Sequence, residues 1–214
     1  MFKGTKKLIK MILFIAIIIL GIYLAINIKY PKTYSDIVLK YAQEYNIDKN
    51  IIYSIIDKES KFHKAAVSDK GAIGLMQIMP DTAEELANEL DLLNYDLTNP
   101  DDNIRIGSYY IKKLINKYDG NLIISLAAYN AGMGNVANWI TDLENFEDIE
   151  SIPVNETKAY VKDVLKNYKM YHLIYDKYRI PPIDIKDEHI DLFHVTKDFF
   201  KGLRKKVKTL YEKI

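Results

Sequence analysis

Apolar residues recur three and four positions apart over most of the chain beyond residue 34, a spacing that places them on one face of an α-helix. Polar residues of the kind that cap helices mark where these segments begin. The expected starts are Ser35 with Asp36, Asp48, Asp81 with Glu84 as a capping box, Asp101, Asn121 and about Asn155. The expected ends include about Leu90, Gly120, Tyr129 and about Tyr178. No stretch alternates convincingly as a strand would, so the predicted fold class is mainly α.

The amino-terminal segment differs because it is apolar on every face. The run MILFIAIIILGIYLAINI, from Met11 to Ile28, has no charged residue. Its length is near the lower limit for a membrane-spanning helix, which takes roughly 17 to 25 residues. The lysines that precede it are Lys3, Lys6, Lys7 and Lys10. This excess of positive charge predicts a single-pass transmembrane helix with a cytoplasmic amino terminus and an exported remainder. A cleavable signal peptide is the alternative, but only Ala25 offers a small residue near its end.

The carboxyl-terminal segment follows a break at Ile180-Pro181-Pro182. From Val195 an amphipathic helix is expected, with a Lys-rich face, either packed on the domain or in contact with a membrane surface or partner. The expected organisation is therefore a cytoplasmic tip and anchor over residues 1–32, a catalytic domain over residues 33–179, and a linker with a terminal helix over residues 180–214.

Composition excludes several classes of function. The formal net charge is +1, so no basic surplus points to nucleic acid. The chain has no cysteine, which excludes a disulfide framework and a thiol nucleophile. The four histidines lack the spacing of metal ligands, so neither a metal site nor a cofactor is expected.

Glu59 is the candidate for acid chemistry because it follows the apolar helical run from Ile51 to Ile56. A carboxyl held against apolar walls has a raised pKa, as a general acid at neutral pH needs. A glutamate at a helix end is ordinarily a solvated charge. The residues beyond it strengthen the functional interpretation: Gly71 and Gly74 would let the backbone approach a ligand, and Gln77 would place an amide in an apolar run.

The same stretch resembles a known family. The motifs are E-S-x-F from Glu59, A-V-S ending at Ser68, G-A-x-G-L-M-Q from Gly71, and I-M-P-x-T-A ending at Ala83. Further along the chain stand N-I-x-x-G-x-x-Y from Asn103, A-A-Y-N-A-G from Ala127, and E-T-x-x-Y-V from Glu156. In this order they resemble the catalytic domain of the soluble lytic transglycosylases.

This resemblance implies a lysozyme-like fold of the goose-type-lysozyme and lytic-transglycosylase kind. It implies cleavage of the β-1,4 bond between N-acetylmuramic acid and N-acetylglucosamine in the peptidoglycan of the bacterial cell wall. Glu59 matches the acid/base of the family. The residues that match its substrate-binding positions are Ser68, Gln77, Met79, Tyr129, Asn130, Glu156 and Tyr160.

The resemblance further implies that one carboxylate is enough. The 6-hydroxyl of the substrate would attack the anomeric carbon, and the product would be a 1,6-anhydro sugar. Two alternatives stay open: a hydrolase of lysozyme type, for which Glu156 could supply a second carboxylate, and a peptidoglycan-binding scaffold without activity. The expected partners are peptidoglycan strands and, through the amino-terminal helix, the membrane; protein partners are not indicated.

Overall fold

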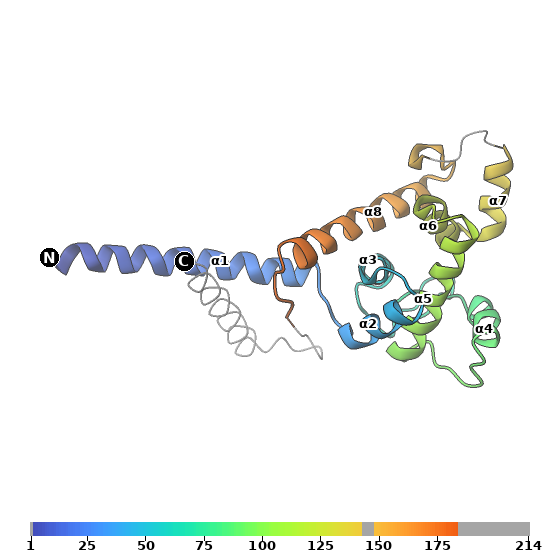
Figure 1. Cartoon of the computed structure of the whole chain (residues 1–214), viewed down its shortest axis with the longest axis horizontal. Coiled ribbons are helices and arrows are strands. Elements are labelled where there is room, and N and C mark those ends of the chain that lie inside the picture. The colour runs from blue at the N-terminus through green and yellow to red at the C-terminus, as the bar shows by residue number, and fades with distance from the viewer. Residues whose placement is uncertain (1, 143–147, 184–214) are drawn as a thin grey trace. The chain divides into compact units, whose positions relative to one another are not determined.

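The computed structural model describes residues 2–142 and 148–183, and almost all of its regular structure is helical (Figure 1). The helices are α1 (Phe2–Lys29), α2 (Ser35–Glu44), α3 (Lys49–Glu59), α4 (Pro80–Glu89), α5 (Pro100–Lys117), α6 (Leu122–Ala131), α7 (Met133–Asp142) and α8 (Asn155–Tyr171). A 3-10 turn, Ile149–Ser151, precedes α8, and a π-helical turn, His172–Lys177, follows it. Within these ranges the β structure is limited to isolated bridges at Val67–Ile73 and Ile73–Ile78. The prediction of a mainly α fold is confirmed.

The chain forms two compact units. One comprises Tyr34–Asp176, and the other joins the residues up to Thr33 to those from Lys177.

Two of the predicted helix starts are confirmed by their caps. A side-chain oxygen of Asp48 accepts a hydrogen bond from the backbone N–H of Asn50 at 2.8 Å, and one of Asn121 accepts from Ile124 N–H at 3.1 Å. These bonds satisfy N–H groups that have no partner in the first turn of a helix.

The helix starts predicted at Ser35 and at about Asn155 are confirmed, but the predicted caps of α2, α4 and α5 are wrong. In α4 and α5 the first residue is proline, Pro80 or Pro100, and the preceding residue takes the cap position. Proline suits the first turn because it has no N–H and its φ is already helical. Asp81 therefore lies in the first turn of α4, and Asn99, not Asp101, caps α5 by accepting from Asp101 N–H at 2.9 Å. Tyr34, in the left-handed conformation, precedes α2 without a side-chain cap.

Helix α6 runs two residues beyond the predicted end at Tyr129, and α7 follows it after Gly132. Gly132 has a φ of 87°, a backbone conformation that glycine adopts without strain. The apolar residues Val136, Trp139 and Ile140 lie three and four positions apart in α7, which is the signal that identifies this short helix.

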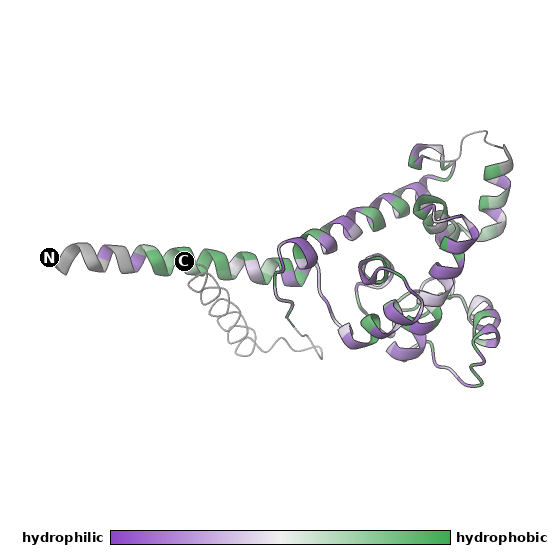
Figure 2. Ribbon diagram, in the orientation of Figure 1, coloured by the Kyte–Doolittle hydropathy of each residue, from purple (hydrophilic) through white to green (hydrophobic). Residues whose placement is uncertain are grey.

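The core of the unit Tyr34–Asp176 is built around α3, which contacts α2 and α8. Ile52, Ile55 and Ile56 of α3 are fully buried. Tyr53 stacks on Tyr171 of α8, with ring centroids 5.4 Å apart. Figure 2 shows hydrophilic and hydrophobic residues alternating along α8, as expected for a helix with one buried face.

The segment between α3 and α4 is irregular but firmly held. Asn103 of α5 is completely buried; its Oδ1 accepts from Met76 N–H at 2.7 Å, and its Nδ2 donates to Ile73 O and Leu97 O, each at 2.9 Å. Ser60 Oγ donates to Leu75 O at 2.8 Å. Buried polar groups that are satisfied in this way fix a loop almost as firmly as a helix.

The second unit contains α1, whose part Lys10–Lys29 is long and apolar enough to cross a membrane by length and composition. Figure 2 shows the hydrophobic colouring along this part of α1. Residues Ile180 and Ile183 pack on the end of α1 against Leu20, Tyr23 and Leu24. The amphipathic segment predicted from Val195 lies outside the described residues.

Candidate active site

Glu59 is the last residue of α3, and its side chain is only partly exposed. Burial raises the pKa of the Glu59 carboxyl from 4.5 to about 7, the direction that the sequence predicts. A hydrogen bond that Oε1 accepts from the Tyr160 hydroxyl at 2.7 Å opposes this rise, as does the charge of Lys58. At neutral pH the carboxyl therefore exists in comparable amounts with and without its proton, as an acid/base requires.

Two tyrosines adjoin this carboxyl. Burial and the charge of Glu59 raise the pKa values of Tyr129 and Tyr160 well above the usual range, so both hydroxyls keep their protons at neutral pH. The Tyr129 hydroxyl donates to Met76 O at 2.9 Å, and the Tyr129 ring lies 5.1 Å from that of Tyr110. Tyr160 is buried and placed to act through Glu59.

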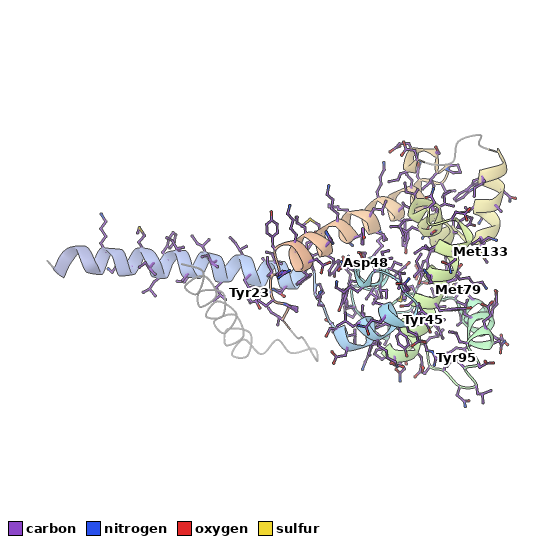
Figure 3. The ribbon with its side chains drawn as sticks, viewed as in Figure 1. Tyr23, Tyr45, Asp48, Met79, Tyr95 and Met133 are labelled. Atoms are coloured by element: carbon purple, nitrogen blue, oxygen red, sulfur yellow. The ribbon has the colours of Figure 1, made fainter. Side chains whose placement is uncertain are left out.

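Two of the three predicted residues on the α3–α4 segment, Ser68 and Gln77, bond to its own backbone. Ser68 Oγ accepts from Ala72 N–H at 3.0 Å. Gln77, which has a φ of 50°, donates from Nε2 to Ala66 O at 3.1 Å and to Gly74 O at 2.9 Å. Met79, labelled in Figure 3, precedes α4 and is 41% exposed. These three side chains therefore belong to one folded loop.

Of the two glycines in this loop, Gly74 differs from the sequence expectation. A Cβ at Gly74 would overlap the Asn103 amide and the Leu97 carbonyl oxygen, so Gly74 is needed for internal packing rather than for the approach of a ligand. A Cβ at Gly71 would meet open space, although its φ of 86° also favours glycine.

A cavity of about 310 Å³ brings together residues from α6, α7 and α8. It is lined by Lys70, Asn130, Ala131, Asn135, Trp139, Val154, Glu156 and Thr157. Glu156 is exposed and forms an ion pair with Lys70, the two charged atoms lying 3.7 Å apart. The cavity unites two predicted site residues, Asn130 and Glu156, and Thr157 lies one helical turn from Tyr160.

The sequence interpretation did not include Lys70, Asn135 or Trp139 among the candidate binding residues. The aromatic ring of Trp139 is a signal for a saccharide subsite, but a single tryptophan at helical spacing favours a core position. Lys70 carried none, because a surface lysine becomes part of a cavity only through the fold. Within residues 2–142 and 148–183, no group of three or more His, Asp or Glu side chains is arranged to hold a metal ion.

Comparison with known proteins identifies the family. Residues 36–152, more than half of the chain, match the transglycosylase SLT domain. The soluble lytic murein transglycosylase of Escherichia coli is 36% identical over 152 residues, which cover 67% of this chain and 23% of that protein. A membrane-bound lytic murein transglycosylase C from Histophilus somni is 33% identical, and the match covers 65% of this chain and 40% of that protein.

Solved structures of lytic transglycosylases resemble the fold of this chain. The lytic transglycosylase Slt of Pseudomonas aeruginosa superposes with a TM-score of 0.65 at 33% identity over 76% of this chain and 27% of that one. The 70 kDa soluble lytic transglycosylase of Escherichia coli gives the same TM-score at 34% identity, over 71% and 26% of the two chains. The chain thus spans about a quarter of the length of these soluble relatives. By sequence motifs, fold and matched region, the chain belongs to the transglycosylase SLT domain family.

Proposed function

We propose that this chain is a peptidoglycan lytic transglycosylase that cleaves the β-1,4 bond between N-acetylmuramic acid and N-acetylglucosamine. The observation that supports this most strongly is the environment of Glu59: a carboxyl whose pKa burial raises to about 7, held by the Tyr160 hydroxyl. The relatives named above are murein transglycosylases, and the Pseudomonas aeruginosa structure is that of an inactive Glu-to-Gln mutant.

The proposed reaction uses Glu59 twice. As an acid it donates its proton to the glycosidic oxygen, so that the bond from the anomeric carbon of N-acetylmuramic acid to this oxygen breaks. The oxygen of the muramic acid 6-hydroxyl then bonds to the anomeric carbon, and the Glu59 carboxylate accepts the proton of that hydroxyl. The products are a 1,6-anhydro end and a free 4-hydroxyl on N-acetylglucosamine, and Glu59 regains its starting state without consuming water.

The other predicted residues fit a groove around this carboxyl. Ser68, Gln77 and Met79 would lie along it on the α3–α4 loop, with Gln77 offering Oε1 because Nε2 already donates to the backbone. Tyr129 adjoins Glu59, and Asn130 and Glu156 would bind substrate in the cavity next to Trp139. An aromatic face with amide and carboxylate groups around it suits the alternating apolar and polar faces of a sugar.

Hydrolysis of lysozyme type is the second candidate, and the surroundings of Glu59 disfavour it. A hydrolase uses a second carboxyl within about 10 Å to activate water or to act as nucleophile. Glu156, the candidate for this role, is exposed and paired with Lys70. Among the described residues no neighbouring carboxylate contributes to the pKa shift of Glu59.

We further propose that residues 1–32 anchor the protein in the cell membrane and that residues 33–179 act outside it on the wall. Residues 180–214 would form a linker and a terminal amphipathic helix. Four lysines before the apolar run favour a cytoplasmic amino terminus.

The test is product analysis. Purified protein is incubated with peptidoglycan, and the soluble products are identified by mass spectrometry beside a Glu59→Gln control. Anhydro-muropeptides from the native protein and none from the control are expected. Reducing-end products would replace the proposal by hydrolysis, and no products from either protein would favour a binding role.

A further inference from the structure

The strongest feature outside the candidate active site joins two distant parts of the chain. Asn27, near the end of α1, is 1% exposed. Its Oδ1 accepts a hydrogen bond from Ile183 N–H at 2.8 Å, and its Nδ2 donates to Tyr23 O at 2.9 Å. A polar residue within an apolar span is costly unless both of its functions are satisfied, and here both the carbonyl and the amino group are used.

Apolar packing accompanies this hydrogen bond. Ile183 and Tyr23 are 7% and 4% exposed, and Leu20, Leu24 and Ile180 pack beside them. The segment Ile180–Ile183, which we call the return segment, is thereby docked on one side of α1.

The position of this contact along α1 determines how deep it would lie in the membrane. An α-helix rises about 1.5 Å per residue, so Asn27 lies about 3 Å and Tyr23 about 9 Å inward from Lys29, the end of the apolar stretch. Amphipathic segments at a membrane surface are buried to a depth of about 5 to 10 Å. The contacts of the return segment on α1, from Leu20 at about 13 Å to Asn27 at about 3 Å, span this depth range.

The composition of the return segment suits the membrane interface. A backbone N–H without a partner is strongly unfavourable in the apolar part of a membrane. Pro181 and Pro182 have no N–H, and that of Ile183 is satisfied by Asn27. The sequence Ile-Pro-Pro-Ile thus offers apolar surface with few backbone donors to satisfy.

The residues just before the return segment are those that favour lipid headgroups. Lys177, Tyr178 and Arg179 are exposed, and the Lys177 ammonium lies 5.7 Å from the centre of the Tyr178 ring. Lys29 adds a further exposed cation at the end of α1. Tyrosine and cationic side chains concentrate at membrane interfaces, and cations near an anionic surface are attracted to it.

We propose that the return segment is a second membrane-contacting element, docked on α1 by Asn27, and that Lys177–Arg179 bind anionic lipid headgroups beside it. This inference rests on the proposed membrane anchor and is independent of the transglycosylase reaction.

The test uses the whole chain, which has no native cysteine. Single variants Pro182→Cys, Leu93→Cys and Ile17→Cys are labelled with the fluorophore NBD and reconstituted in vesicles of phosphatidylethanolamine and phosphatidylglycerol. Quencher groups are attached to the lipids either near the headgroup or deep in the acyl chain. Shallow quenchers are expected to reduce emission from position 182 at least twofold. Leu93, 95% exposed and in the other unit, should be unaffected, and Ile17 should respond to deep quenchers.

Asn27→Leu, which removes the acceptor at similar volume, is expected to abolish at least half of the quenching at position 182. Ile28→Leu, at a side chain that is 63% exposed, is the matched control and should leave it unchanged. Quenching at 182 should also weaken about twofold in vesicles of neutral phosphatidylcholine, because the attraction of the cations is lost.

The outcomes separate the proposals. If emission from position 182 is as unaffected by the quenchers as that from position 93, while position 17 is quenched, the return segment does not contact the membrane. The proposed anchor would stand in that case. Failure of Ile17 to insert would overturn the anchor together with this inference. Unchanged quenching in Asn27→Leu would overturn docking by Asn27, and equal quenching in neutral vesicles would overturn the headgroup contact. None of these results bears on the products formed from peptidoglycan.

Discussion

At the scale of single residues, two opposed interactions determine the pKa of Glu59. Burial at the end of α3 favours the protonated carboxyl, and the Tyr160 hydroxyl favours the carboxylate. Because burial has the larger effect, the pKa settles at about 7. A group balanced in this way can both release and accept a proton near neutral pH, and each interaction can be removed separately by mutation.

Glu59→Gln is expected to stabilise the protein above about pH 7 and to leave its stability unchanged near pH 4. The folded-state pKa is raised from 4.5 to about 7, so with rising pH the unfolded state ionises first and folded stability falls across this interval. The full shift corresponds to about 3 kcal/mol, which we reduce to about 1.5 because the side chain is partly exposed. Thermal denaturation at both pH values, followed by circular dichroism, measures the difference. An equal effect at both would contradict burial as the cause.

Tyr160→Phe is expected to raise the pKa of Glu59, because it removes a hydrogen bond that favours the carboxylate. The decline of activity at alkaline pH, where the acid loses its proton, should move upward by about one pH unit. The rate profile of muropeptide release against pH gives the shift. Tyr110→Phe, at a ring that packs on Tyr129, is the control and should leave the profile in place. A Tyr160 that only fills space would lower the rate without moving the profile.

At the scale of elements, the loop between α3 and α4 depends on α5. Gly74→Ala should lower the free energy of unfolding by several kcal/mol, since a Cβ there overlaps Asn103 and Leu97. Gly71→Ala has nearly the same positive φ and open space around it, so it should lose only about 1 kcal/mol. The difference between the two, measured by denaturation, isolates the overlap from the backbone strain. Equal losses would show that Asn103 does not limit the position.

The cavity between α6, α7 and α8 leads to a separate prediction. Trp139→Ala is expected to raise KM for peptidoglycan about tenfold with little change in kcat, because it removes an apolar surface of the cavity on which a sugar would bind. Trp139→Phe should retain most of the affinity. Steady-state kinetics on solubilised strands and co-sedimentation with insoluble wall measure the two effects. A loss of kcat alone would instead indicate that Trp139 supports the fold of α7.

The sequence predicted elements better than contacts. Periodic apolar residues with Asp48 and Asn121 as caps identified helices, because both signals act within a few residues. At α4 and α5 the prolines at positions 80 and 100 take the first helical position, and the cap lies two residues before the predicted one. The bond from Tyr160 to Glu59 joins residues 101 apart, and the packing of Gly74 on Asn103 likewise depends on the fold. The motifs include these residues, but only the tertiary structure shows that Tyr160 bonds to Glu59 and that Gly74 packs on Asn103.

At the scale of the whole molecule, the proposed anchor α1 would determine on which side of the membrane the other unit lies. With the proposed topology, Leu93→Cys in intact cells that express the chain should react with a membrane-impermeant maleimide, whereas Lys7→Cys should react only after the membrane is opened. Both positions are exposed, so reactivity reports location rather than burial. Labelling of both in intact cells would contradict the predicted orientation. Labelling of neither position in intact cells would place the unit Tyr34–Asp176 inside the cell.

The contact between α3 and α8 has a consequence for motion. Polar bonds follow one another along this helix pair, from Tyr168 with Asp48 through Asn167 with Asp57 and Lys58 with Asp163 to Tyr160 with Glu59. The pair of Tyr160 and Glu59 is the last in the series, at the end of α3. In the proposed reaction Glu59 exchanges the phenol for a sugar oxygen by rotating its side chain, while the other bonds keep the two helices in register. Proton transfer then needs no opening of the domain, and its speed is separate from that of substrate entry and product release.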